Sequence, residues 1–397
     1  MRILWFSPFL LQPATQGGQI RSLGILKWLN RRHEVRFVSM QLDGQEDGVA
    51  SVGEYCGSSR LIRHSLPRRG GMEFAVQLLM NLVSELPLTI ERDISPDFRA
   101  AAGEEMAKGW HDVAVCDFLS LAVNTARLDE MVLFQHNVET VIWERMAQRA
   151  SNPAARAYLN RQARRMAEFE KRQCLAARQV VAVSETDEGM MRERFGATRV
   201  STIPTGVDLE RNYPQPDHAA GAELVFVGSL DWGPNLDGLR WFAAEVLPGV
   251  RQAHSGCRLA IVGKNPGAEA ESIGRLAPGI SIHGNVADVR PYLWGAKAAI
   301  VPLHAGGGTR LKIYEAMGAG VAQVSTTIGA EGLEVRDGVD IMLADTADAF
   351  KQACLRLLKE DDFRQRMAGE AGRVVREKFG MESVAEVFEQ ILEQARR

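Results

Sequence analysis

The 397-residue sequence has little net charge, few cysteines and no long apolar run. Its 47 Lys and Arg residues against 50 Asp and Glu residues give a formal charge of −3, which excludes a highly basic protein that coats nucleic acid. The longest apolar runs, such as residues 298–303, fall far short of the roughly 20 residues that a membrane-spanning helix needs. The five cysteines are scattered without CxxC spacing, so we expect reduced core thiols in an intracellular protein and no metal site.

Several motifs of common α/β enzymes are absent as well. The sequence contains no GxGxxG dinucleotide fingerprint, no GxxxxGK[ST] phosphate loop and no GxSxG nucleophile elbow. It has no Asp-x-Asp pair, which argues against a divalent metal held by paired carboxylates. The apolar stretch at residues 3–6 is interrupted by Pro8 and follows a single basic residue, so we interpret it as a buried strand rather than a signal peptide.

Short apolar runs alternate with amphipathic stretches along the whole chain, a pattern typical of parallel sheets covered by helices on both faces. Strands are predicted at residues 2–6, 34–39, 113–117, 131–136, 180–184, 224–228, 258–263, 280–283, 298–303 and 321–325. Helices are predicted at residues 20–30, 72–84, 154–177, 236–246, 310–317 and 381–397. Because the pattern occurs twice, we predict an α/β protein with two doubly wound, Rossmann-like domains that face a central cleft.

The predicted domains are residues 1–205 and residues 217–380. They are joined by a predicted linker at residues 206–216, which contains Pro214 and Pro216. Ligands of such folds bind at the carboxyl ends of the strands, so we expect the functional residues directly after strands.

The strongest candidate site is at residues 301–317, where a strand ends, three glycines follow and a helix starts near Thr309. Free amides at the helix start, with Arg310 and Lys312 in its first turn, are suited to bind a pyrophosphate. Cations at this helix end oppose the helix dipole, at a cost of a few tenths of a kcal/mol unless an anion binds. Glu315, about one turn further on, is suited to accept hydrogen bonds from ribose hydroxyls. The alternative is a solvated helix end with an ordinary Lys312–Glu315 pair.

Weaker candidates lie in the first half of the chain. The pair Gly17–Gly18 precedes a helix and allows a ligand to approach the backbone closely, although a simple tight turn is the alternative. His136 follows a strand and faces the predicted cleft, but a lone histidine is more often a hydrogen-bonded structural residue. Asp117 also follows a strand, and helix capping is its simplest interpretation.

Residues 306–312 (GGGTRLK), followed by residues 315–317 (EAM), resemble the donor-site motif of the family-four, GT-B-fold retaining glycosyltransferases. Three other segments are similar to this family in order and spacing. Residues 136–139 (HNVE) resemble its mid-domain loop, residues 203–208 (IPTGVD) its linker entry, and residues 224–230 (LVFVGSL) the opening of its second domain. The resemblance covers essentially the whole chain.

The resemblance implies transfer of a sugar, with retention and without a metal, from a UDP- or GDP-sugar to a hydroxyl acceptor. The implied acceptor is a glycan, a lipid-linked intermediate or a small glycoside, as in polysaccharide biosynthesis, and no nucleic-acid partner is expected. The first domain is then the acceptor side and the second the nucleotide-sugar side. The helix at residues 381–397 is expected to pack back on the first domain.

The resemblance also assigns roles to individual positions. The implied catalytic residues are His136, Arg310, Lys312 and Glu315. The implied donor-binding residues are Gly17, Gly18, Gly228, Ser229, Val286, Gly307, Gly308, Thr309, Arg310, Lys312 and Glu315. Among these, Glu315 corresponds to the glutamate that binds the ribose, the two cations are expected at the diphosphate, and the loop at residues 283–286 is expected at the base.

Two positions depart from the family pattern. Gly307 stands where the first glutamate of an E-x7-E motif is expected, and residues 231–235 (DWGPN) replace an Arg/Lys pair after Gly228. We infer that Arg310 and Lys312 have taken over the cationic role. The departures leave two alternatives open: a nucleotide-sugar-binding protein or inactive paralogue, and a GT-B-fold epimerase or hydrolase. The second alternative requires an additional carboxylate at the anomeric centre.

Basic residues lie beside an apolar helical stretch in the first half of the chain. Arg60, Arg63, Arg68 and Arg69 precede the stretch at residues 74–83, and further basic residues follow at 156–172. Such an arrangement can dock on anionic lipid, although the glutamates interleaved at 168 and 170 favour a solvated helix face. We therefore expect a cytoplasmic protein, with peripheral contact with the inner membrane surface as a further hypothesis.

Overall fold

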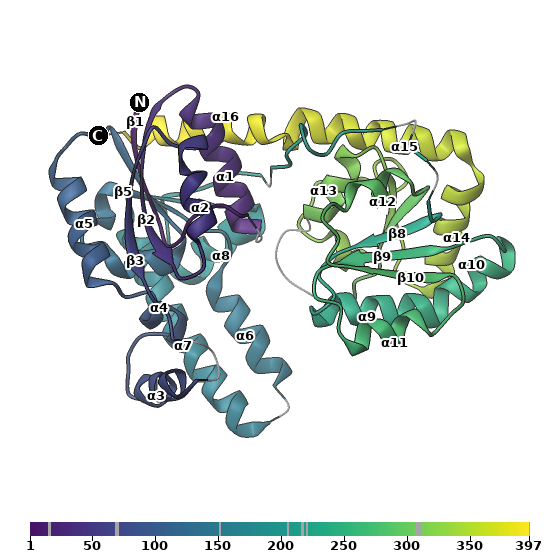
Figure 1. Ribbon diagram of the computed structural model, residues 1–397, viewed down its shortest axis with the longest axis horizontal. Helices are drawn as coiled ribbons and strands as arrows, with labels where there is room; N and C mark the ends of the chain where they lie inside the picture. Colours follow the sequence, from purple (N-terminus) through teal and green to yellow (C-terminus); the bar gives the residue numbers. More distant parts are fainter. Residues whose placement is uncertain are drawn as a thin grey trace. The chain divides into compact units, whose positions relative to one another are not determined.

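The computed structural model describes residues 1–396 except for residues 15–16, 68–70, 151, 205, 216–217, 220 and 306–310. The chain divides into two compact units (Figure 1). Unit 1 comprises Met1–Gly206 and Val384–Arg397, and unit 2 comprises Val207–Ser383. The chain therefore passes from one unit to the other twice, once after Gly206 and once before Val384.

Unit 1 is built on a seven-stranded sheet with the strand order β3-β2-β1-β4-β5-β6-β7, in which all neighbouring strands are parallel. The strands are β1 (Arg2–Ser7), β2 (Glu34–Leu42), β3 (Ser58–His64), β4 (Val113–Asp117), β5 (Met131–Phe134), β6 (Gln179–Ala182) and β7 (Val200–Thr202). The direction of strand order reverses between β1 and β4. The loops after these two strands therefore diverge at the carboxyl edge, where doubly wound sheets bind ligands.

Helices flank this sheet, and two of them form a pair that extends beyond it. The helices are α1 (Gly17–Asn30), α2 (Glu46–Ala50), α3 (Met72–Asn81), α4 (Leu88–Arg92), α5 (Pro96–Ala107), α6 (Glu139–Arg149), α7 (Pro153–Ala176), α8 (Glu185–Phe195) and α16 (Met381–Gln394). Helices α6 and α7 form a pair that extends beyond the sheet (Figure 1). Helix α3 lies beside α7, where Gln162 Nε2 donates a hydrogen bond to Asn81 Oδ1 at 2.7 Å.

Unit 2 is built on a six-stranded parallel sheet with the strand order β10-β9-β8-β11-β12-β13. The strands are β8 (Leu224–Val227), β9 (Leu259–Gly263), β10 (Ile280–Gly284), β11 (Ala298–Val301), β12 (Ala322–Ser325) and β13 (Met342–Leu343). Its helices are α9 (Gly233–Trp241), α10 (Leu247–Ala253), α11 (Ala268–Gly274), α12 (Arg290–Trp294), α13 (Leu311–Gly318), α14 (Ala347–Lys359) and α15 (Asp361–Val374). The α/β class and the two parallel sheets predicted from the sequence are confirmed.

Three strands have no counterpart among the predicted strands. Strand β3 (Ser58–His64) reads as a basic stretch, yet it pairs with β2 over seven residue pairs at the sheet edge. Strands β7 (Val200–Thr202) and β13 (Met342–Leu343) are too short to form an apolar run. All three form because a neighbouring strand offers backbone partners, and burial of a continuous apolar segment is not needed at an edge.

The segment predicted as a linker packs on unit 2 where the structure describes it. Val207 is fully buried and forms a parallel bridge with Gly380. Asn212 is buried, and a Cβ on Gly318 of α13 would lie 3.0 Å from the Asn212 carbonyl oxygen. Residues 207–215 of the predicted linker, Pro214 included, therefore belong structurally to the second unit.

The C-terminal helix α16 packs on unit 1 from Val384 onward. The ring of Phe388 lies 5.6 Å from that of Trp5 on β1 and 4.9 Å from that of Phe134 on β5. On the same helix the Glu389 carboxylate accepts a hydrogen bond from His33 Nε2, and His33 Nδ1 lies 3.0 Å from the N-terminal amine. The helix therefore covers strands at the centre of the first sheet.

All five cysteines are buried free thiols. Within the described ranges, no helix is both long enough and apolar enough to cross a membrane.

The packing of Phe388 leads to a prediction about the stability of unit 1. Phe388→Ala is expected to lower the free energy of unfolding of unit 1 by about 3–5 kcal/mol, because it leaves a cavity against Trp5 and Phe134. Gln390→Ala, at an exposed position of the same helix, is expected to change it by less than about 0.5 kcal/mol. Urea unfolding followed by tryptophan fluorescence measures both variants. Equal effects of the two substitutions would mean that α16 does not contribute to the core.

Candidate functional site

His136, directly after β5, is buried at the carboxyl edge of the first sheet. Its Nε2 donates a hydrogen bond to Asp117 Oδ1 at 2.8 Å, and Trp5 Nε1 donates to Asp117 Oδ2 at 3.1 Å. Arg21 Nη1 of α1 donates to His136 Nδ1 at 3.0 Å. This network assigns the Nε2–H tautomer to a neutral imidazole. Asp117 therefore joins the ends of β1, β4 and β5 rather than capping a helix.

Burial lowers the pKa of His136, and the neighbouring Asp117 carboxylate opposes this effect only in part. The ring is therefore neutral at pH 7. Both nitrogens are engaged within unit 1, one as a donor and one as an acceptor. This arrangement suits a residue that holds the loop after β5 in place.

Phe118, which sequence reasoning did not single out, has a φ of 68°. Positive φ is uncommon for a bulky residue and marks strain that the surrounding structure must hold. Its ring lies 4.1 Å from that of His136 and 4.8 Å from that of Phe9. A Cβ on Gly18 would lie 2.7 Å from Phe118 Cε1, whereas nothing lies within 4 Å of a Cβ on Gly17. Gly18 is therefore required by packing against Phe118, and Gly17 is not.

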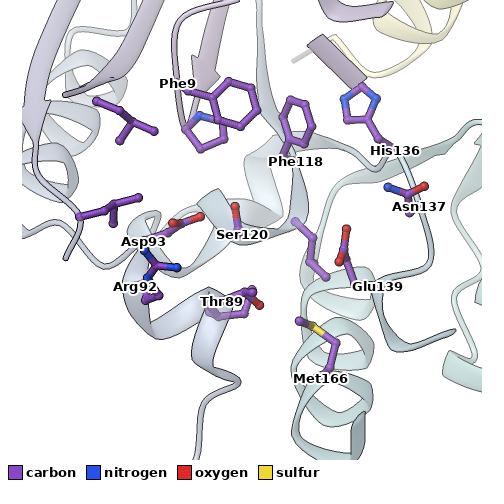
Figure 2. A pocket seen from close by; sticks show the side chains of 15 residues that line it. Phe9, Thr89, Arg92, Asp93, Phe118, Ser120, His136, Asn137, Glu139 and Met166 are labelled. Carbon is purple, nitrogen blue, oxygen red and sulfur yellow. The ribbon is translucent and has the colours of Figure 1, made fainter. Parts of the chain in front are cut away.

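A pocket of about 380 Å³ opens at the carboxyl ends of β1, β2, β4 and β5 (Figure 2). Figure 2 shows Phe9 and Phe118 on one side of the pocket and Asp93, Ser120 and Glu139 on the other. Its lining residues are Pro8, Phe9, Leu42, Leu66, Thr89, Ile90, Arg92, Asp93, Phe118, Leu119, Ser120, His136, Asn137, Glu139 and Met166. The pocket thus lies at the predicted edge of the sheet, where the loops after β1 and β4 diverge.

Two carboxyl groups line this pocket. Burial raises the pKa of Asp93, although a hydrogen bond from the Ser120 hydroxyl and the charges of His64 and Arg92 favour its ionised form. Burial also raises the pKa of Glu139, against a hydrogen bond from the Asn137 side chain. The pocket therefore combines an aromatic wall with two desolvated acids.

A fully buried carboxyl group lies at the N-terminus of α6, beside Glu139. Glu170 of α7 accepts hydrogen bonds from the backbone N of Glu139 at 3.0 Å, the backbone N of Thr140 at 2.9 Å and Thr140 Oγ1 at 2.6 Å. It thereby satisfies amides that the helix start leaves without intrahelical partners. Burial nevertheless raises the pKa of Glu170 to about 7, with a further contribution from Glu139.

In unit 2, Lys312 in the first turn of α13 lies against the loop after β8. Its Nζ donates a hydrogen bond to Asn235 Oδ1 at 3.0 Å and lies 4.5 Å from the ring centroid of Phe226. Asn235 Nδ2 in turn donates to the Ser229 carbonyl at 2.8 Å. A Cβ on Gly228 would lie 2.8 Å from Lys312 Nζ, so the glycine leaves room for the ammonium group. Sequence reasoning predicted Lys312, Gly228 and Ser229 but treated Asn235 only as part of a departure from the family pattern.

Glu315 lies one turn further along α13 and is partly buried. Burial raises its pKa, and the positive charges of Arg211 and Lys312 oppose the rise. Arg211 comes from the segment predicted as a linker, where its backbone N donates to Asp208 Oδ1 at 3.0 Å. Arg211 is thus a cation near Glu315 that the sequence alone did not indicate.

The loops after β8, β9 and β10 are tied together by asparagine side chains. The backbone N of Asn265 donates to Asn285 Oδ1, and Asn265 Nδ2 donates to Asp231 Oδ2, each at 2.9 Å. Asn265 and Asn285 have φ values of 55° and 52°, a conformation that asparagine tolerates better than most residues. Val286, predicted to lie near a base, packs against the core of unit 2 directly after this tie.

The predicted site residues thus fall into two groups and a remainder. Gly228, Ser229, Lys312 and Glu315 lie around the start of α13 in unit 2, and Gly18 and His136 meet at Phe118 in unit 1. Gly17 and Val286 belong to neither group. Gly307, Gly308, Thr309 and Arg310 lie outside the described residues. Within the part of the chain that is described, no group of three or more His, Cys, Asp or Glu residues is placed to hold a metal ion.

Two family models match the chain. The model described as Glycosyltransferase Family 4 matches residues 101–211, and the model described as Glycosyl transferases group 1 matches residues 221–360. A protein described as an uncharacterised 44.6 kDa protein in the cps region of Klebsiella pneumoniae is 27% identical over 171 residues. This match spans 41% of the present chain and 43%, less than half, of that relative.

Solved structures match the fold over nearly its full length. HepE from Anabaena, in complex with UDP and glucose, has a TM-score of 0.66 at 13% identity and covers 99% of this chain and 100% of its own. WaaG, a glycosyltransferase of lipopolysaccharide biosynthesis, has a TM-score of 0.65 at 15% identity and covers 99% of each chain. A variant of TarM from S. aureus has a TM-score of 0.65 at 12% identity, covering 99% of this chain and 100% of its own. At such identities the likeness shows the fold alone.

The buried Glu170 predicts a pH dependence of stability. Because its folded-state pKa is raised from 4.5 to about 7, its contribution to stability is fully present below pH 4.5 and is lost as the pH rises to about 7. This loss amounts to about 3 kcal/mol, because each pKa unit between the unfolded and folded states corresponds to about 1.36 kcal/mol. In Glu170→Gln this loss is expected to be absent. The unfolding free energy of the wild type, measured relative to that of the variant, is therefore expected to fall as the pH rises from 4.5 to about 7.

Urea unfolding at several pH values between 4 and 8 measures the difference. Glu193→Gln removes a carboxyl group at an exposed position of unit 1 and serves as the control. Parallel pH profiles for the wild type and Glu170→Gln would contradict the raised pKa.

Proposed function

We propose that this chain, which carries a Glycosyltransferase Family 4 domain and a Glycosyl transferases group 1 domain on a GT-B fold, transfers a sugar from a UDP-sugar to a hydroxyl acceptor, with retention of configuration and without a metal. The observation that carries this proposal is Lys312, held by Asn235 and Phe226 beside Gly228 at the carboxyl edge of the second sheet. An ammonium group at a helix start is unfavourable unless an anion binds there, and a nucleoside diphosphate supplies that anion.

UDP is the favoured nucleotide, with GDP as the alternative. The HepE structure contains UDP and glucose, and the TarM structure contains UDP, as their descriptions state. In the present chain, Glu315 would accept hydrogen bonds from both ribose hydroxyls and thereby gain the partners that its burial demands. Arg211 would keep this carboxyl group ionised, since its charge opposes the rise in pKa that burial causes.

The chemistry then depends on charge and position. The bond between the anomeric carbon and the diphosphate oxygen breaks, and the acceptor oxygen forms its bond on the same face of the sugar. The proton of the acceptor hydroxyl passes to the departing diphosphate oxygen, so the scheme needs no enzymic nucleophile. Lys312, with Arg310 from the predicted motif, would stabilise the negative charge that develops on the diphosphate.

The pocket of unit 1 is the proposed acceptor site. It lies after β1, β4 and β5, and it offers carboxyl, hydroxyl and aromatic groups within one cavity of about 380 Å³. A glycan, a lipid-linked intermediate and a small glycoside each present hydroxyl groups to such a site. His136 holds the loop that supplies Asn137 and Glu139, so we assign it a positioning role rather than proton transfer.

A calorimetric screen of UDP-, GDP-, ADP- and TDP-sugars tests the donor. NMR of the product's anomeric signal then decides between retention and inversion, and turnover in EDTA tests independence from metal. Binding of a nucleotide sugar without turnover over a full acceptor panel would favour a binding protein or inactive paralogue. Release of an isomerised nucleotide sugar would favour an epimerase.

Three variants test the donor site. Lys312→Met and Glu315→Gln are each expected to lower kcat/KM by at least ~10-fold, since each removes a charged contact to the donor. Gly228→Ala is expected to weaken UDP binding more than it lowers stability, because its methyl group displaces mainly the ends of the Lys312 and Asn235 side chains and lies 3.1 Å from Phe226 Cζ. The control Lys297→Met removes an exposed cation before β11, at the opposite edge of the same sheet. Unchanged kinetics in all three variants would refute the site.

We further propose that α3 brings unit 1 to an anionic lipid surface. The side chains of Met72 and Val83 are 85% and 86% exposed, and Val76, Leu79, Met80 and Leu82 are exposed between them. The exposed Arg161 and Arg164 of α7 lie near the end of α3, where Arg165 Nη1 donates to the Asn81 carbonyl at 2.8 Å. An apolar helix face next to cations suits binding at the interface of a negatively charged membrane.

Vesicle sedimentation at low and high salt tests this contact. The wild type is expected to bind phosphatidylglycerol vesicles at low salt, and each of Arg161→Gln and Arg164→Gln is expected to weaken binding by about 5-fold, or about 1 kcal/mol. Met72→Ser and Val83→Ser are each expected to weaken binding at either salt concentration. Val49→Ser, at another exposed apolar position, serves as the control. No binding at low salt would end the proposal.

A further inference from the structure

We propose that the pocket of unit 1 selects an uncharged sugar unit as the acceptor, and that Asp93 and Glu139 are the residues that select it. This inference rests on the proposed transferase function and narrows its acceptor class. A neutral glycosyl unit is favoured over a uronic acid or a phosphorylated sugar.

The charges of the lining residues are the first evidence for this selection. Asp93 and Glu139 enter the pocket from α4 and α6, on the side opposite to Phe9 and Phe118 (Figure 2). Each accepts one side-chain hydrogen bond, from Ser120 and Asn137 respectively. A carboxyl group offers about four lone-pair positions, so both retain acceptor capacity toward a ligand. Vicinal hydroxyl groups of a sugar can donate to these oxygens, whereas an anionic ligand would be repelled by them.

Arg92 is the cation among the described lining residues, and part of its hydrogen-bonding capacity is already used. Its guanidinium lies 5.4 Å from the ring centroid of Phe74, and its Nη2 donates to the Pro67 carbonyl at 3.3 Å. Its charge also acts on the adjacent Asp93 and offsets part of that negative charge. The remaining electrostatic bias of the lining is therefore set by Glu139 and disfavours a negative ligand.

The opposite wall suits the apolar face of a sugar ring. The rings of Phe9 and Phe118 meet at 4.8 Å with an interplanar angle of 63°. The positive φ of Phe118 turns its ring toward Phe9, and packing against Gly18 and His136 holds it there. The volume of about 380 Å³ is near the lower end of the range of roughly 300–1,000 Å³ for small-molecule sites. The pocket thus fits one small cyclic ligand between an apolar and a hydrogen-bonding wall.

Burial supports the same assignment. The raised pKa of Asp93 and that of Glu139 make both acids easier to protonate, and a protonated carboxyl group donates as well as accepts hydrogen bonds. Sugar hydroxyls also do both, so the two acids match a neutral polyol in either protonation state. A uronate or a phosphate would require enough positive charge to offset both acids, and Arg92 offsets only part of the charge of Asp93.

Matched pairs of probes test the inference directly. Methyl glucoside is compared with methyl glucuronide, and methyl galactoside with methyl galacturonide, because the members of a pair differ mainly in charge. Saturation-transfer NMR on the full chain measures binding, and transfer from the donor found in the nucleotide-sugar screen measures kcat/KM. The neutral member of at least one pair is expected to bind and to accept sugar at least ~10-fold better than its anionic partner.

The variants Asp93→Asn and Glu139→Gln preserve shape and remove the charge. Each is expected to lower kcat/KM for the neutral acceptor by roughly 10- to 100-fold, as for loss of a hydrogen bond to a charged group, and to narrow the preference over the anionic partner. Affinity for UDP is expected to stay unchanged, because the proposed donor site is built from residues of unit 2. Asp129→Asn and Glu193→Gln remove exposed carboxyl groups of unit 1 as matched controls, and urea unfolding verifies that all four variants fold.

The outcomes separate this inference from the proposed function. If no nucleotide sugar is turned over, even with water as the acceptor, the transferase proposal itself fails. If the donor is turned over but the anionic probes are preferred, only the acceptor class is wrong. Failure of every neutral probe to bind, or unchanged acceptor kinetics in both pocket variants, would also overturn the inference while leaving the donor site intact.

Discussion

The buried carboxylate of Asp117 is the interaction on which the organisation of unit 1 depends. A desolvated carboxylate is tolerated only with hydrogen-bond donors around it, and here these come from Trp5 on β1 and from His136 after β5. Arg21 on α1 completes the arrangement through the other nitrogen of the His136 ring. One charge thereby fixes the ends of neighbouring strands and the direction in which the chain continues. The pocket exists because Phe118 and Asn137, which directly follow Asp117 and His136, are held at its wall.

Unit 2 uses the same principle with the opposite charge. Lys312 would be poorly placed at a helix start in isolation, but the amide of Asn235 and the face of Phe226 receive its ammonium group. Gly228 makes this approach sterically feasible. These contacts keep the ammonium group in position, and its positive charge favours an anionic ligand. A cation fixed in this way would need little rearrangement to meet the proposed diphosphate, and preorganisation of this kind stabilises developing charge effectively.

The departures from the family pattern have a structural interpretation. The residues that replace the Arg/Lys pair after Gly228 include Asn235, which now orients Lys312. Asp231 from the same stretch is bound by Asn265, and Asn265 also bonds Asn285, so this loop is fastened to those after β9 and β10. The loop is thus tied to its neighbours and, through Asn235, to Lys312 in the first turn of α13. Arg211 adds a cation near Glu315, in a chain where Gly307 takes the place of the first glutamate of the motif.

The sequence by itself determined the two parallel sheets, most strand positions and the motif around Lys312 and Glu315, because apolar periodicity and glycine–cation spacing are local properties of the chain. It did not indicate β3, whose pairing at an edge compensates for its polar sequence. Only the tertiary structure decided the contacts of His136 with Arg21 and of Lys312 with Asn235, since these partners are 115 and 77 positions apart. The φ of Phe118 and the meeting of Asp93 and Glu139 in one pocket depend likewise on how distant loops converge. Local patterns encode which elements form, and the order of strands in the sheet decides which side chains those elements bring together.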